Sequence, residues 1–356
     1  MSEQNTKVAE SRPDATADHS TPKANPVQNF LRGPAGRNVG LVIALALLFV
    51  VGAVTSGDRF LNPENMLTIL RYASIIGVVS VGVTFVITAG GIDLSVGSVL
   101  GLTSVVASLT SVQLAATQSS WILMVIVALA VGAFAGLVNG LVVAYGNVVS
   151  FIATLAMLVG ARGLAELISG RSTQIVTNRD FSQIMRSDVL GIPILVWIFV
   201  VVAVAGWFLL NRTTFGRRTI AIGGNLEAAR LAGIKVKRHQ VYLYVLAGLT
   251  AGIGGVMMLG RTTAGTSTHG LLLELEVIAA VVVGGTLLIG GRGTIMGTVL
   301  GVLIFSTLVN VFTQNNLDTS IQALVRGLIL VVAVLLQQRF ATRGKTRRAK
   351  PKPVKV

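Results

Sequence analysis

The amino-acid sequence predicts an all-α integral membrane protein with about ten transmembrane helices, some of them short or broken, and an internal repeat. Two properties of the composition predict this class: 53% of the 356 residues are hydrophobic and only 12% are charged. A soluble domain of this size needs more charge to cover its surface. The hydrophobic residues also form long blocks, and blocks of about 18 residues with few charges are typical of transmembrane helices.

Ten hydrophobic segments account for the expected spans. They are 39–57, 74–89, 97–116, 121–145, 148–168, 192–210, 241–260, 272–290, 295–312 and 321–336. We expect a transmembrane domain over 38–338, which includes a polar loop at 211–240. Residues 1–37 are polar and predict a disordered arm, and 339–356 form a basic tail.

Most of the net charge of +15 comes from two places beside hydrophobic helices. The stretch 339–355 holds eight Lys and Arg without an acid, and 212–238 holds seven with one acid, Glu227. Positive charge beside apolar helices marks the cytoplasmic side, so this pattern argues against nucleic-acid binding. With an even number of spans, we expect a multi-pass protein of the bacterial inner membrane with both termini and the loop in the cytoplasm.

Before the second segment, Asn62-Pro63-Glu64 has the composition of a helix start, with an N-cap, a proline in the first turn and an acid. We expect a short separate helix there, at the outer membrane interface. The many glycines of the hydrophobic segments include several spaced four apart, which lets helices approach closely in lipid. Packing within one bundle explains most of them, and contact between subunits is the alternative.

A repeat with an offset of 200 residues relates 90–101 to 290–301, with six identical positions. Paired, glycine-interrupted segments in two halves of a chain indicate a transport pathway. Six segments separate the copies, so either the repeat is parallel or one segment does not span. We expect the second and eighth segments, which adjoin the glycines, to be the discontinuous ones.

The polar loop encodes a short helix with a signal at each end. Asn225 is a good N-cap, Glu227 suits the first turn, and Gly233 suits the C-terminal cap. This predicts a helix over 226–232 that is too small for a core of its own. It packs either on another protein or on its own bundle.

Acidic and amide side chains near the segments are the candidates for a pathway or gate. Asp93 lies between a glycine pair and Ser95, where it could cap the next helix, form a gate or contact substrate. Glu274 and Glu276 are two residues apart and do not share a helix face. Asn139 lies inside the fourth segment, either as a contact between helices or in the pathway, and Arg162 could neutralise a nearby acid such as Glu166.

No motif for catalysis or nucleotide binding occurs in the chain. The sequence has no Walker A motif, no His-Glu-x-x-His and no Gly-x-Ser-x-Gly, and it contains no cysteine. Its three histidines are scattered, which gives no argument for a metal site. We therefore expect a transport protein and not an enzyme, without a cofactor of its own.

Four stretches resemble the permeases of ribose, xylose and galactose ABC importers, in the sugar and branched-chain amino acid permease superfamily. They are 90–97, 147–155, 213–234 and 274–286, and the resemblance extends from about residue 60 to 338. It implies that a short loop helix docks on a cytoplasmic ATPase subunit. The residues that take this role by resemblance are Gly224, Asn225, Glu227, Ala228, Ala229, Arg230 and Gly233.

The resemblance also implies the partners. They are cytoplasmic ATPase subunits that bind ATP and Mg, an extracytoplasmic sugar-binding protein, and a second copy or homologue of the permease. Pentoses and hexoses are the expected substrates, and the particular sugar stays open. An ion-coupled secondary transporter of a small polar solute is the alternative, and it would use Asp93, Glu274 or Glu276 as its coupling site.

Overall fold

The computed structural model describes residues 34–329, 331 and 335. The chain divides into two units, Met1–Arg37 and Asn38–Val356, and the fold described below is that of the second unit. Most of the expected polar arm and all of the basic tail 339–356 lie outside the described residues.

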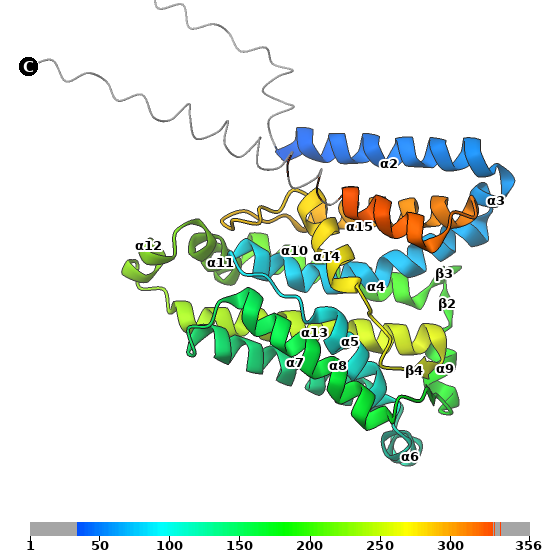
Figure 1. Ribbon diagram of the computed structural model, residues 1–356, viewed down its shortest axis with the longest axis horizontal. Coiled ribbons are helices and arrows are strands. Elements are labelled where there is room, and N and C mark those ends of the chain that lie inside the picture. The colour runs from blue at the N-terminus through cyan, green and yellow to red at the C-terminus, as the bar shows by residue number, and fades with distance from the viewer. Residues whose placement is uncertain (1–33, 330, 332–334, 336–356) are drawn as a thin grey trace, which may run out of the picture. The chain divides into compact units, whose positions relative to one another are not determined.

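Helices make up most of the described chain (Figure 1). They are α2 (Pro34–Ser56), α3 (Asp58–Leu61), α4 (Pro63–Thr88), α5 (Val96–Ala107), α6 (Thr110–Gln118), α7 (Ile122–Ala144), α8 (Ser150–Ser169), α9 (Arg179–Met185), α10 (Ile194–Arg212), α11 (Thr214–Gly224), α12 (Leu226–Leu231), α13 (Val236–Thr262), α14 (Leu273–Val283) and α15 (Ile295–Gln314), and 319–329 is also helical. Two antiparallel pairs of two-residue strands join β1 (Gln174–Ile175) to β4 (Ala264–Gly265) and β2 (Asp188–Val189) to β3 (Ile192–Pro193).

Two ends of the helical bundle serve as reference points below. The loop end is where α11 and α12 lie, and the far end is where α9 and the four strands lie (Figure 1). Seven helices among the described residues are long and apolar enough to cross a membrane. An eighth crossing is added if α5 and α6, which meet at an angle of 57°, count as one broken span.

The broken segments are the third and the eighth, and our expectation of a break in the second was wrong. The second segment belongs to α4, which runs unbroken for 26 residues and is mostly buried. The eighth contains α14, which has only 11 residues and follows a non-helical stretch at 263–272. The tenth segment, 321–336, extends beyond the continuously described residues.

The start signal at Asn62 begins α4 itself and not a separate interfacial helix. The Asn62 side chain accepts a hydrogen bond from the Glu64 backbone N–H at 2.9 Å, so the predicted cap is present. No glycine or proline follows Pro63 until Gly77, and the helix therefore continues directly into the hydrophobic segment. The helix begins where the sequence predicted, but it does not end before the second hydrophobic segment.

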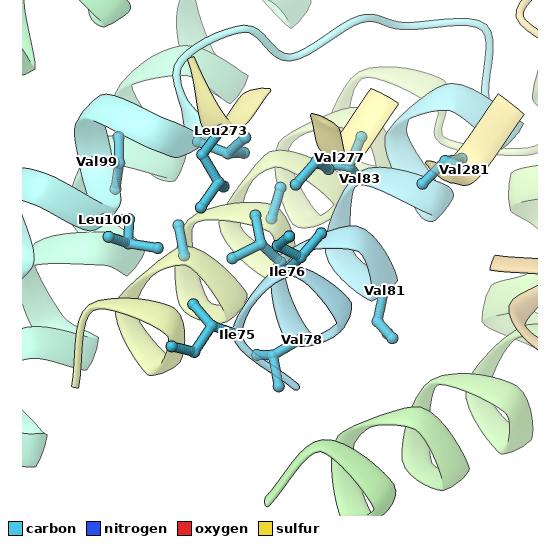
Figure 2. Packing of buried hydrophobic residues seen from close by; sticks show 14 of the residues in the cluster. Ile75, Ile76, Val78, Val81, Val83, Val99, Leu100, Leu273, Val277 and Val281 are labelled. Carbon is cyan, nitrogen blue, oxygen red and sulfur yellow. The ribbon is translucent and has the colours of Figure 1, made fainter. Parts of the chain in front are cut away.

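Helix α4 lies at the centre of the core. It packs against α10, α13, α14 and α15, and its residues from Ala73 to Thr88 are almost all buried. Figure 2 shows apolar side chains from α4, α5 and α14 meeting in this core. Since α14 and α5 are the short helices next to the two repeat copies, the repeat lies against the central helix of the described core.

The regularly spaced glycines pack helices within the chain. On α7, side chains added at Gly132 and Gly136 would collide with the backbone of α13, at Gly248 and Tyr244. Gly301 of α15 likewise lies against the Ala280 backbone of α14. The structure thus supports the interpretation that most of these glycines serve packing within one bundle.

Candidate functional site

The loop helix predicted from sequence is present as α12, and it ends one residue earlier than expected. The Asn225 side chain accepts from the Ala228 N–H at 2.9 Å, which is the predicted N-cap. After the helix, Gly233 has φ +82 and its N–H donates to the Arg230 carbonyl at 3.0 Å. Both caps are local, so this helix keeps its shape without a partner.

Most of α12 is exposed, and one side chain anchors it. Ala229 is buried against Ile222 of α11 and Val236 of α13. Glu227 and Arg230 form an exposed ion pair at 3.0 Å. Ala228 is exposed as well.

Leu226 and Leu231 complete the exposed surface of α12, and Leu231 is 82% exposed. Neither leucine was among the residues predicted from the sequence, since a single leucine in a short helix gives no signal of exposure. They add apolar area to an exposed helix surface that also carries the Glu227–Arg230 ion pair.

Gly224 joins α11 to α12 beside a junction of glycines that links this loop to both repeat copies. A Cβ on Gly223 would collide with the Thr88 carbonyl and the Gly291 N–H, and Gly291 itself donates to that carbonyl at 2.8 Å. Gly90 and Gly290 are also in contact. We call this set the glycine junction: Thr88, Gly90, Gly223, Gly290 and Gly291.

The two repeat copies therefore meet in space and run in the same direction. Helix α5 follows one copy and α15 the other, so both leave the junction at the loop end. At their far ends, the Ser108 side chain lies against β4, and the Gln314 side chain donates to Asn65 near the start of α4 at 2.7 Å. The structure thus favours the parallel alternative for the repeat.

Three of the candidate pathway residues form one buried cluster between Gly91 and α5. Asp93 is 1% exposed, and its Oδ1 accepts from the Ser95 N–H at 2.9 Å and from the Ser95 hydroxyl at 2.6 Å. Asn139 of α7 donates to the same hydroxyl at 2.9 Å. Among the described residues, no Lys or Arg forms an ion pair with Asp93.

Helix α8 holds the neighbouring backbone of this cluster. The Ser150 hydroxyl accepts from the Ile92 N–H and the Thr154 hydroxyl from the Leu94 N–H, both at 3.2 Å. The cluster thus clamps the break between α4 and α5 in one conformation. Since Asp93 is enclosed by these groups, the structure does not place it on an open surface.

Glu274 and Glu276 have separate surroundings, as their spacing predicted. Glu276 accepts from the Tyr72 hydroxyl at 2.7 Å and pairs with Arg326 of the last described helix. Glu274 is buried against Gly97 of α5, and its Oε2 has no hydrogen-bond partner among the described residues. The two acids therefore belong to different contacts and do not act as a pair.

Arg162 interacts electrostatically with Glu274 and Glu166, but it donates its hydrogen bonds elsewhere. Glu166 pairs with Arg171 at 3.4 Å. The Arg162 guanidinium instead donates to two backbone carbonyls, of Ser267 and, at 2.8 Å, of His269. No group of three or more His, Cys, Asp or Glu that could hold a metal occurs in the described part of the chain.

Comparison with known proteins gives matches over most of the chain. Residues 65–334 match the family described as branched-chain amino acid transport system, permease component. The ribose import permease RbsC of Haemophilus influenzae is 38% identical over 306 residues, 85% of this chain and 93% of the relative. RbsC of Bacillus subtilis is 39% identical over 305 residues, which are 85% of this chain and 93% of that relative.

The L-arabinose permease AraH of Escherichia coli K12 is 37% identical over 328 residues, 90% of this chain and 96% of that protein. No solved structure matches. The family match covers well over half of the chain and includes both repeat copies, the clamped break and the capped loop helix. The chain therefore belongs to the family of permease components of branched-chain amino acid transport systems.

Proposed function

We propose that this chain is the membrane-spanning permease subunit of an ATP-driven importer for a monosaccharide, a pentose or hexose, in the bacterial inner membrane. Its similarity to proteins named ribose and L-arabinose permeases supports the substrate class. The observation that carries the mechanism is α12, which presents Glu227, Arg230 and Leu231 outward and is attached to the glycine junction.

The exposed surface of α12 also supports the expected partners. An ATPase subunit that binds ATP and Mg receives α12, and an extracytoplasmic binding protein delivers the sugar at the far end. Movement of α12 reaches two non-helical connections at once, because Gly223 touches Thr88, just before the connection from α4 to α5, and Gly291, within the connection from α14 to α15. Through this contact, closure of two ATPase subunits would move α12 and the residues at the start of α5 and α15 together. Coupling between distant sites needs such a continuous physical connection.

A second copy of the permease completes the pathway. Helix α8 packs on α5 and α7 and exposes its other face. On that face, side chains added at Gly160 and Gly163 would meet no atom within 4 Å, unlike those at Gly132 and Gly136 of α7. Small residues without an internal neighbour suit close contact with another helix. This supports a dimer in which α8 lies near the partner and the pathway.

The proposed topology has ten crossings with both termini in the cytoplasm. The seven long helices, the bent pair α5 and α6, the stretch 263–283 and the last helix supply them.

An ion-coupled transporter is the rival function. Among the described residues, Asp93 is enclosed by Ser95 and Asn139, and Glu276 is paired with Arg326, which leaves neither free to exchange ions with both sides.

The proposal requires α12 to lie on the side that contains ATP, and cysteine labelling tests this requirement. The chain has no cysteine, so single substitutions are unambiguous. In intact cells, an impermeant thiol reagent should label Leu190→Cys, in the 87% exposed tip between β2 and β3. It should label Asn225→Cys only after the cells are broken. Labelling of Asn225→Cys from outside would overturn the orientation and with it the docking of α12 on an ATPase.

A further inference from the structure

A non-helical stretch, 263–272, joins α13 to α14 and lies along one face of α5. Its first residues form β4, and the rest is non-helical. Small side chains make this face of α5, at Gly97, Gly101, Ser104 and Ser108. In the stretch, the residues that contact this face are, in antiparallel order, Gly270, His269, Ser267 and Gly265.

This stretch descends deep into the bundle. Since α5 has 12 residues, it is about 18 Å long, and the stretch contacts it from its last turn to Gly97 in its first. Because α5 and α6 together form one candidate broken span, a stretch that runs beside most of α5 lies within the hydrocarbon layer, which is about 30 Å thick. Irregular backbone at such depth occurs only where protein buries it or where it lines a water-filled cavity.

Neighbouring elements hold the stretch on two sides, with β1 paired to β4 and with α8 and α5 bonded to the residues that follow. Arg162 of α8 donates to the carbonyls of Ser267 and His269, and the Ser104 hydroxyl lies 3.1 Å from Nδ1 of His269. These bonds fix the stretch on α5. Both ends also have a non-glycine residue in the left-handed region, Thr263 with φ 53 and Leu272 with φ 61. Such conformations persist only where the surroundings enforce them.

Two threonines of the stretch are at least partly exposed. Thr268 is exposed and Thr266 is half-buried, and their hydroxyl oxygens are 3.1 Å apart. Facing lipid, hydroxyls beside non-helical backbone would be unfavourable. In contact with water, the same hydroxyls can form hydrogen bonds and carry no such cost. The position and the chemistry of these two residues therefore indicate a wet surface at membrane depth.

We propose that 263–272 lines the outer half of the translocation pathway and that Thr266 and Thr268 hydrogen-bond to hydroxyl groups of the sugar as it passes. The inference rests on the proposed function, which supplies the substrate class. A threonine hydroxyl both donates and accepts, as a sugar hydroxyl does. It carries no charge, so it binds a passing solute weakly enough to release it, which conduction requires.

Accessibility is the first test and needs no sugar. In intact cells, a small charged thiol reagent should label Thr268→Cys much faster than Val204→Cys. Val204 is the matched control, because it is 60% exposed on the wholly apolar outer face of α10. Equal protection of the two cysteines would place Thr268 against lipid or protein and would overturn the inference.

Transport is the second test, in proteoliposomes that hold the permease, its ATPase and its binding protein. The Thr266→Val, Thr268→Val double variant should take up D-ribose or L-arabinose three- to tenfold more slowly, the effect of losing one or two neutral hydrogen bonds. Its ATP hydrolysis should match that of the wild type. Thr117→Val, which removes an equally surface-located hydroxyl from α6, should transport normally. Unchanged uptake by the double variant would contradict the sugar contact, while failure of ATP-driven uptake by the wild type would contradict the proposed function instead.

Discussion

Gly223→Ala should destabilise the permease and abolish coupled sugar uptake. Its new methyl group would collide with the Thr88 carbonyl and the Gly291 N–H, which are backbone atoms and cannot rotate away. Overpacking of this kind costs about 1–3 kcal/mol. The collision also separates α11 from the connections that lead into α5 and α15, so ATP hydrolysis should continue without uptake. The measurements are the melting temperature of the purified protein and sugar uptake per ATP hydrolysed.

The neighbouring residue provides the matched control for stability. A side chain added at Gly224 would meet no atom within 4 Å, and its φ is not in the left-handed region. Gly224→Ala should therefore keep the wild-type melting temperature. If the two alanine variants melt at the same temperature, the glycine junction is not the close contact described here.

Glu227→Arg should release the ATPase from the permease while the protein stays inserted in the membrane. It replaces an ion pair with repulsion from Arg230, which lies 3.0 Å from Glu227. It also places a positive charge in the first turn of α12, at a local cost of roughly 1 kcal/mol. The greater effect is on the exposed docking surface, where we expect roughly tenfold less ATPase to co-purify.

Glu64→Arg is the control for that substitution. Glu64 is also an exposed acid in the first turn of a helix, and it also lies near an arginine, Arg71 at 3.9 Å. It lies at the start of α4, at the far end of the bundle from α12. Glu64→Arg should leave ATPase co-purification unchanged. If Glu227→Arg retains the ATPase as well as Glu64→Arg does, the assignment of α12 as the docking helix is wrong.

The elements that could be predicted from the sequence have local signals. The caps of α12 depend on residues within three or four positions of each other, at Asn225 and Gly233, and both were predicted. The bond between Asp93 and Ser95 is equally local. Hydrophobic blocks located the seven long candidate spans of the described residues, because apolar length indicates whether a segment suits the bilayer, but the predicted count of ten is not confirmed.

What could not be predicted depends on contacts between distant parts of the chain. Nothing near Arg162 indicates that its partners are carbonyls about a hundred residues later, since a nearby acid is the simpler choice. Broken and continuous spans are also alike in hydropathy. Segment eight ends in the non-helical residues 284–290, where Gly284 lies against the Gly297 backbone of α15, and α4 continues because neighbours on several sides bury it. The glycine junction brings together residues from three distant parts of the chain, and this contact follows only from the three-dimensional fold.

The energy source of transport tests the account most directly. The measurement is sugar uptake into sealed proteoliposomes that hold this chain with its ATPase and its binding protein, with ATP and Mg supplied on the side of α12. The account predicts that uptake proceeds with ATP and no ion gradient, and that it stops when the ATPase is omitted. Uptake that requires a proton or sodium gradient and proceeds without any ATPase would contradict it.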